Sequence, residues 1–404
     1  MEKHPDIVIF SGEDSIIVAY DFDQIIRRKG TSCNKWDGMK GIFVKDGLLP
    51  MWIADMDFTC PVPVLEAVCE RMKHPIYGYS FPPDSCYGAI IDKLYRDYGW
   101  KIEKEWIVFT HGVVDGIHSA IKAVTAPGDG VIVQRPVYYP FFSIISNNHC
   151  QIQNNPLSNT DGYYTIDYDN LDAQFQPQTK ALLFCSPHNP VGRVWKEEEL
   201  KRLGDLCLRN RCIILSDEIH SDITYGTHKH RVFAAIDREI EARSMTFLSA
   251  SKTFNIPGLT TAYVVIPNKE LRDAYLLARM NQMGGNLFGY AALEAAYNHS
   301  GEYKTELLCY IKKNIDCFAG YIDSYLPELK LMPPEGSYLL WVDMRRLDLP
   351  QERLSQLMEA CGLALDDGRL FGSEGAGFWR FNVACPESYV RQALDNMKNI
   401  IPRR

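Results

Sequence analysis

The sequence of 404 residues lacks features that mark whole classes of protein. It has no run of the roughly 18 apolar residues that a membrane-spanning helix needs. It has no excess of basic residues, since 51 Asp and Glu outnumber 43 Lys and Arg and the net charge is −8. A nucleic-acid-binding protein would normally show a basic face. Residues 1–20 contain acidic side chains and no long apolar core, which argues against a secretory signal. We therefore expect neither a membrane nor a nucleic acid as partner.

The twelve cysteines include no C-x-x-C pair, and the chain has no internal repeat or low-complexity linker. Several cysteines, such as Cys185 and Cys212, lie in apolar runs. Small buried thiols in a reducing compartment are the favoured interpretation, ahead of disulfides or a zinc site. The sequence therefore predicts a cytoplasmic protein without a metal site.

One lysine occupies an unusual place. Lys252 follows an apolar run at residues 245–248 that is typical of a buried strand. Burying an ammonium group is costly, and a lowered pKa or a covalent partner relieves the cost. Such a lysine can form a Schiff base with a carbonyl compound, and the hydroxyls of Ser249 and Ser251 could hold a phosphate. We hypothesise that Lys252 carries pyridoxal phosphate; an exposed lysine after a strand is the simpler alternative.

Strand and helix patterns alternate from residue 106 onward. This alternation predicts an α/β fold with a doubly wound, mostly parallel sheet. In such sheets ligands bind beyond the carboxyl ends of the strands. Strands are predicted at residues 106–110, 131–134, 181–185, 212–215, 245–248 and 261–266. Five polar, aromatic or glycine residues lie just past strand ends: Gly112, Tyr138, Asn189, Asp217 and Lys252.

The rest of the chain predicts a second, smaller α/β domain. Helix patterns dominate after about residue 270, and strand and helix patterns alternate again near the C-terminus. We assign residues 49–290 to a large cofactor-binding domain and residues 1–48 with 291–404 to the small domain. Residues 150–178 are polar and predicted to be irregular, while residues 7–10 and 16–20 could form short strands.

Pyridoxal phosphate makes demands that these residues could meet. A carboxylate must keep the pyridine nitrogen protonated so that the ring can accept electrons, and Asp217 suits this role. Asn189 and His220 could contact the ring oxygen, and Tyr138 could stack on the ring. A helix cap for Asp217 and an ordinary half-buried histidine for His220 are the alternatives.

The phosphate and a substrate carboxylate need further partners. Gly112, Val113 and Val114 could offer backbone N–H groups at the start of a helix, where the dipole favours an anion. Arg380 lies in an apolar stretch and suits a carboxylate, although a structural ion pair is the alternative. Asp55 lies in an apolar segment, residues 48–58, that suggests a loop packed against the site. It is a further substrate-binding candidate.

Three motifs occur together and in a fixed order. They are Asn-Pro-x-Gly at residues 189–192, Asp-x-x-His at 217–220 and Ser-x-Ser-Lys at 249–252. The chain resembles fold-type-I, aspartate-aminotransferase-like pyridoxal-phosphate enzymes of the class I/II aminotransferase superfamily. Through residues 52–58, 77–80, 112–114 and 186–193 it most resembles the cystathionine β-lyase branch of carbon–sulfur lyases typified by MalY and PatB.

This resemblance implies roles for individual residues. Lys252 would hold the cofactor and move protons, Ser251 would help to bind the phosphate, and Arg380 would bind the substrate carboxylate. Tyr79 would reach the phosphate of a neighbouring subunit, which implies a homodimer with shared active sites. Ordinary aminotransferases of this fold have an arginine where this chain has Thr260, and the lyase branch resembles this sequence in lacking it.

The resemblance also implies a reaction. The expected activity is α,β-elimination of a cystathionine- or cysteine-type amino acid to a thiol or sulfide, pyruvate and ammonia. A pyridoxal-phosphate-dependent aminotransferase is the alternative within the superfamily. A regulatory or binding protein with secondary lyase activity is the alternative from another class.

Overall fold

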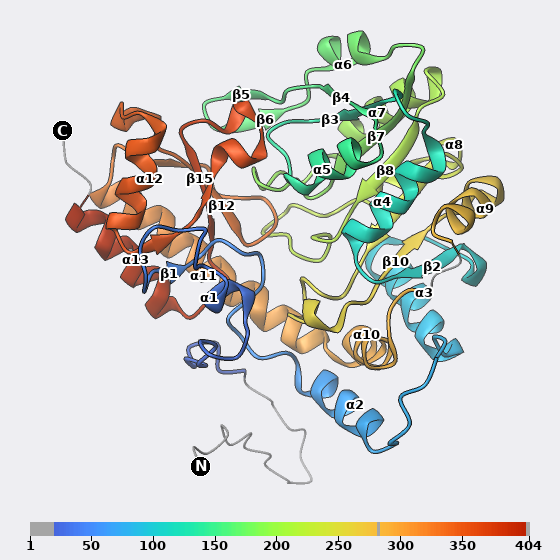
Figure 1. The fold of residues 1–404 in the computed structure, drawn as a ribbon, viewed down its shortest axis with the longest axis horizontal. Coiled ribbons are helices and arrows are strands. Elements are labelled where there is room, and N and C mark those ends of the chain that lie inside the picture. Colours follow the sequence, from blue (N-terminus) through green and yellow to red (C-terminus); the bar gives the residue numbers. More distant parts are fainter. Residues whose placement is uncertain (1–19, 281–282, 401–404) are drawn as a thin grey trace.

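A computed structural model describes residues 20–280 and 283–400 of the chain. Its centre is a seven-stranded sheet with the strand order β2-β10-β9-β8-β7-β3-β4 (Figure 1). All neighbouring strands run parallel except at β10, which is antiparallel to both β9 and β2. The strands are β2 Ile107–Thr110, β3 Gly130–Val133, β4 Gln151–Asn154, β7 Thr179–Cys185, β8 Ile213–Asp217, β9 Ser244–Leu248 and β10 Ala262–Val265. The prediction of a mostly parallel α/β sheet is confirmed.

Helices cover both faces of this sheet because its strands are apolar on both sides. Within β7, Ala181 and Leu183 pack on one face, whereas Leu182 and Phe184 pack on the other. The first face is covered by α4 Val113–Val124, α5 Pro140–Asn147 and α9 Lys269–Ala278. The opposite face is covered by α6 Tyr168–Gln174, α7 Glu197–Arg209 and α8 Arg238–Glu241.

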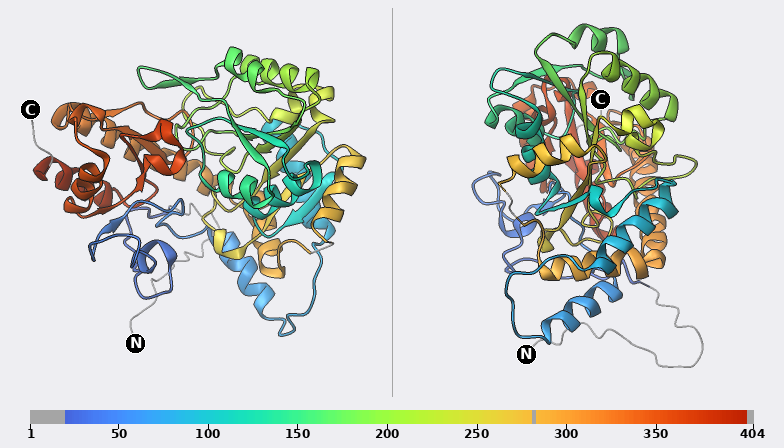
Figure 2. Two further views of the ribbon diagram at one scale, coloured as in Figure 1. Left: turned by 45° about the horizontal axis from the view of Figure 1, so that its top comes forward. Right: turned by 90° about the vertical axis from the view of Figure 1, so that its right-hand side faces the viewer.

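A second sheet of four strands, in the order β11-β12-β15-β14, lies beside the first (Figures 1 and 2). Its strands are β11 Lys330–Leu331, β12 Leu339–Asp343, β14 Asp366–Asp367 and β15 Phe378–Asn382, and the helices of this part are α11 Gly301–Tyr325, α12 Gln351–Ala360 and α13 Glu387–Ile400. β1 Leu49–Pro50 pairs with β13 Leu363–Ala364, so the N-terminal segment joins the C-terminal one. The division at residues 49 and 290 stays a prediction.

Helices α2 Val62–Met72, α3 Asp84–Tyr98 and α10 Leu287–His299 lie below the large sheet in Figure 1, whereas the short α1 Asn34–Asp37 lies on the side of the smaller sheet. Short 3-10 helices occur at Lys104–Trp106, Phe233–Ile236, Pro257–Leu259, Arg345–Leu347, Gly368–Phe371 and Ser373–Gly375. α10 packs against both α2 and α3. The glycine pair before α10 allows a close approach, because a Cβ on Gly284 would lie 2.0 Å from the Phe109 carbonyl oxygen.

The prediction of an irregular segment at residues 150–178 is wrong. This segment contains β4, the hairpin of β5 Ser158–Thr160 and β6 Tyr163–Thr165, and α6. β4 is a polar edge strand that is held in place by pairing with β3. Its sequence has no alternating apolar pattern from which a strand could be predicted. The possible strands at residues 7–10 and 16–20 lie outside the described residues, apart from Tyr20, which is in no strand. Among the described helices, none has the length and apolarity to cross a bilayer.

Candidate active site

A cavity of about 190 Å³ lies at the carboxyl ends of the parallel strands. Residues that follow β2, β3, β7, β8 and β9 meet there, as expected for ligand sites of such sheets. The lining includes Gly112, Val113, Val114, Tyr138, Asn189, Asp217, His220, Ser249, Ser251 and Lys252. Thr260 and Thr261 also line the cavity. They precede a strand, but β10 runs antiparallel and therefore begins at the edge where the others end.

Lys252 presents its amine to this cavity. Its Nζ donates to the carbonyl oxygen of Ala54 at 2.5 Å. Burial and the nearby charge of Arg380 lower the pKa of Lys252 to about 8, while Asp55 and Asp217 oppose this shift. A lysine with such a pKa is partly neutral near physiological pH and can act as a nucleophile or a base.

Asp217 is a buried carboxylate at the end of β8, only 4% exposed. It accepts a hydrogen bond from the Ile219 N–H at 3.2 Å. Burial raises the pKa of Asp217 to about 7. Within the described part of the chain the carboxylate has no ion-pair partner, so a protonated ring nitrogen would supply the missing cationic donor. The residues present therefore fit a pyridine ring.

His220 lies beside Asp217 in the cavity lining. Burial, together with the charges of Lys252 and Arg380, lowers the pKa of His220 to about 3. The ring is therefore neutral and has one N–H donor. Its Nδ1 lies 3.4 Å from Ser337 Oγ, and Tyr338 packs against it edge-on at 5.8 Å. This geometry suits a contact with a ring oxygen.

The other end of the cavity offers neutral hydrogen-bond donors. Gly112 is the N-cap of α4 and has no side chain to cap the free N–H groups of the first turn, which can bind an anion. Ser249 Oγ donates to the Thr261 carbonyl and accepts from the Ser251 N–H. Thr260 has the left-handed φ of 42°, and its hydroxyl accepts from Asn286. Such strain in a β-branched residue is typical of functional sites.

Arg380 lies buried in β15 and is fixed by three acceptors. They are the carboxylate of Asp366, the carbonyl oxygen of Trp52 at 2.8 Å and Oδ1 of Asn189 at 3.1 Å. The ion pair considered from the sequence is therefore present. Arg380 Nε is buried without a partner among the described residues, which leaves the guanidinium capacity for another acceptor. Its role toward a substrate carboxylate stays a prediction.

Asp55 is engaged elsewhere in the structure. Its carboxylate accepts two hydrogen bonds from Arg28, at 2.7 and 3.2 Å. The neighbouring Asp57 binds the buried Lys35 at 2.6 Å and Arg28 at 2.8 Å. Asp55 is not part of the cavity lining, and its role in substrate binding stays a prediction.

Two residues at or next to the cavity lining, Ala54 and Tyr338, were missed from the sequence. The Ala54 carbonyl accepts from Lys252 and also from the Tyr338 hydroxyl, at 3.0 Å. The apolar segment around Asp55 signalled a packed loop but did not single out Ala54. Nothing local marks Tyr338, because it directly precedes β12 of the smaller sheet and its role depends on how the two sheets pack.

Tyr79 does not line the cavity. It lies in the segment between α2 and α3 and is fully exposed. Ile76, Tyr77 and Phe81 in the same segment are also more than half exposed. The structure of one chain thus leaves an apolar segment uncovered.

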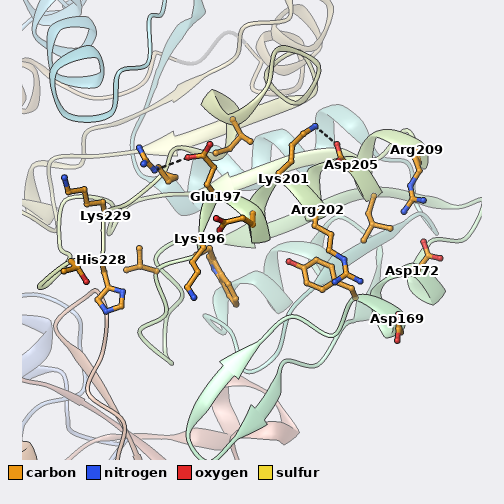
Figure 3. A pocket seen from close by; sticks show the side chains of 18 residues that line it. Asp169, Asp172, Lys196, Glu197, Lys201, Arg202, Asp205, Arg209, His228 and Lys229 are labelled. Carbon is orange, nitrogen blue, oxygen red and sulfur yellow. Dashed lines mark hydrogen bonds and ion pairs between the residues drawn. The ribbon is translucent and has the colours of Figure 1, made fainter.

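A larger groove of about 1420 Å³ shares no lining residue with the cavity. It runs along α7 and is lined by charges of both signs (Figure 3). Several of these charges pair with one another, as Lys201 does with Asp205 at 2.6 Å. The groove is an exposed, mutually neutralised surface. No group of side chains within residues 20–280 and 283–400 is arranged to hold a metal ion.

Comparisons with known proteins agree with this geometry. The family described as "Aminotransferase class I and II" matches residues 69–397. Cystathionine β-lyase PatB of Bacillus subtilis is 38% identical over 382 residues, which cover 94% of this chain and 99% of PatB.

Solved structures give the same picture. Cystalysin from Treponema denticola, which contains pyridoxal 5′-phosphate, has a TM-score of 0.91 and 35% identity, with 95% of this chain and 98% of that chain covered. The pyridoxal-phosphate-bound C–S lyase from Staphylococcus hominis has a TM-score of 0.91 and 31% identity, with 96% and 99% covered.

Proposed function

This chain belongs to the aminotransferase class I and II family, and from that premise we propose that it is a pyridoxal-phosphate-dependent carbon–sulfur β-lyase. It converts L-cystathionine- or L-cysteine-type substrates to a thiol or sulfide, pyruvate and ammonia. One observation carries the proposal. Lys252, with a lowered pKa, and Asp217, a buried carboxylate without an ion-pair partner among the described residues, line one cavity. The similarity to PatB and to the C–S lyase supports the choice of reaction.

Different residues of the cavity would bind different parts of the cofactor. Lys252 would hold its aldehyde carbon and Asp217 its ring nitrogen. Asn189 and His220 would contact the ring oxygen, and Tyr138 would lie against the ring. The phosphate would bind the N-terminus of α4 at Gly112, Val113 and Val114, together with Ser249 and Ser251.

When bound, pyridoxal phosphate supplies a conjugated ring that accepts the electron pair left on the substrate Cα. The amine of Lys252, released when the substrate amine takes its place, would accept the Cα proton as a general base, a role that its lowered pKa favours. Arg380 orients the substrate through its carboxylate. The buried carboxylate of Asp217 would keep the pyridine nitrogen protonated, and in this form the ring accepts electrons. The electron pair left at Cα then forms a Cα–Cβ double bond as the bond from Cβ to sulfur breaks, and the thiolate leaves with the electrons of the broken bond. Water would convert the released enamine to pyruvate and ammonia.

The proposal is tested by supplying L-cystathionine without a 2-oxo acid and measuring pyruvate and free thiol. Equal amounts of the two products are expected. Lys252→Ala should lose this activity, whereas Lys201→Ala, a control on the exposed face of α7, should keep it. If turnover requires an added 2-oxo acid, the protein is an aminotransferase and the lyase proposal is wrong.

A homodimer with shared active sites is part of the proposal. The exposed segment that carries Tyr77, Tyr79 and Phe81 suits burial against a second copy. Tyr79 of one subunit would then contact the cofactor phosphate of the other. Light scattering should give twice the 46.1 kDa mass of the chain. The twelve free thiols support a cytoplasmic location, where disulfides are rare.

A further inference from the structure

A buried ionic cluster lies beside two of the segments that line the cavity. Its centre is Asp222, whose side chain is 5% exposed. Asp222 Oδ1 binds Lys93 Nζ at 2.8 Å and the Tyr98 hydroxyl at 2.9 Å, both from α3. Lys304 of α11 lies 3.6 Å away, and Asp97 bridges the two lysines at 3.2 Å from each. The cluster therefore ties two helices to the segment that follows β8.

Asp222 also joins two turns of the proposed active site. It lies on the segment after β8, two residues beyond His220 and five beyond Asp217. Its Oδ2 accepts a hydrogen bond from Thr253 Oγ1 at 3.1 Å. Thr253 is fully buried and directly follows Lys252. A single carboxylate thus connects the turn that bears the ring-binding residues with the turn that bears the lysine.

Two neighbouring lysines keep the carboxylate of Asp222 negatively charged. Burial alone would raise the pKa of Asp222, but Lys93 and Lys304 outweigh burial and hold the pKa well below its usual range. Asp222 is therefore ionised near neutral pH. A hydrogen bond to an ionised acceptor is stronger than one between neutral groups, so the bond from Thr253 is a firm constraint.

We propose that Asp222 is a positioning residue that fixes the Lys252 turn, through Thr253, relative to Asp217 and His220. The inference rests on the proposed function, in which Lys252 holds the cofactor and moves a proton. A misplacement of about 1 Å in an active site can cost about 100-fold in rate. The cluster prevents such a displacement by anchoring both turns to α3 and α11.

The test uses the holoenzyme with Thr253→Val, which removes the hydroxyl and keeps the shape of the side chain. Asp222→Asn is less informative because it removes one of the two carboxylates, Asp222 and Asp97, that balance the charge of the buried Lys93. We expect kcat to fall about tenfold or more with KM little changed. We also expect the pH titration of the visible absorbance of the Lys252-bound cofactor to shift by about 0.5 pH unit or more. Thr253→Ser retains the hydroxyl and should restore both values.

Thr179→Val is the matched control. Thr179 is also buried, and its hydroxyl donates to Gln153 Oε1 at 2.8 Å, but it begins β7 at the end remote from the cavity. It should lower the melting temperature as Thr253→Val does and leave kcat and the titration unchanged. If Thr253→Val behaves in the same way, Asp222 acts only on stability and the proposal is overturned.

The two proposals fail in different ways. Wild-type protein without pyruvate release or without cofactor absorbance would refute the proposed function. Wild-type kcat and titration in Thr253→Val would refute the positioning role of Asp222 alone. The spectral titration reports on Lys252 whichever reaction the holoenzyme catalyses.

Discussion

The ion pair between Arg380 and Asp366 makes a quantitative prediction about substrate binding. Asp366 lies in β14 directly opposite Arg380 in β15, and both side chains are buried. A substrate carboxylate bound to Arg380 would share the guanidinium with Asp366. Substituting Asp366→Asn removes the competing negative charge and keeps an oxygen that can accept a hydrogen bond. The substitution should therefore lower the stability of the substrate-free protein and strengthen substrate binding.

The magnitudes follow from the burial of the pair. Removing one partner of a buried ion pair costs about 3–5 kcal/mol, because the other charge is left uncompensated. The carboxylate of a bound substrate can replace the missing charge. If it recovers about 1.4 kcal/mol of that cost, binding strengthens about tenfold. We therefore expect KM to fall about tenfold with kcat within about threefold of wild type.

The assay measures KM for L-cystathionine and the urea midpoint with and without a non-reactive amino acid. The stability deficit of Asp366→Asn should shrink when the amino acid is present. Asp367→Asn is the matched control, because the adjacent Asp367 pairs with the exposed Arg369. Exposed pairs contribute about 0–1 kcal/mol, so KM should not change. An increase of KM in Asp366→Asn would show that Asp366 orients Arg380 for the substrate, and would refute this reasoning.

Three further predictions concern the cofactor. Lys252→Ala should lower the elimination rate at least about 1000-fold and abolish the visible absorbance of the bound cofactor; retained activity would rule out Lys252 as the anchor. In cofactor-free protein, the pKa of Asp217 is raised to about 7 from an unfolded value of about 3.9. The folded state then binds more protons than the unfolded state between these values, so stability falls as pH rises from about 4 to about 7. Asp217→Asn should remove up to about 4 kcal/mol of this pH-dependent loss of stability, because a pKa difference of about three corresponds to three times about 1.36 kcal/mol. Parallel pH profiles of the free energy of unfolding in urea for variant and wild type would contradict this prediction. Tyr79→Phe should speed cofactor dissociation in a dimer of unchanged mass, and an unchanged rate of loss during dialysis would exclude a role for the hydroxyl.

The sequence alone determined most of the large sheet and the residues of the cavity. Apolar runs that end in polar or glycine residues are local patterns, and parallel strands bring their carboxyl ends to one edge whatever the details of packing. The positions of Asn189, Asp217 and Lys252 followed from this rule. The edge strand β4 did not, because it depends on pairing with β3 and has no apolar period of its own.

The tertiary structure decided what each site residue touches. Nothing near Arg380 in the sequence indicates that Asp366 neutralises it. Nothing near Lys252 indicates that the Ala54 carbonyl accepts from its amine. Thr253 and Asp222 are separated by 31 residues and meet only because β8 and β9 are adjacent. Strand ends and motifs depend on residues that are near one another in the sequence, so they can be recognised from the spacing of those residues. The partners of a buried charge depend on which distant segments pack around it, and only the fold brings them together.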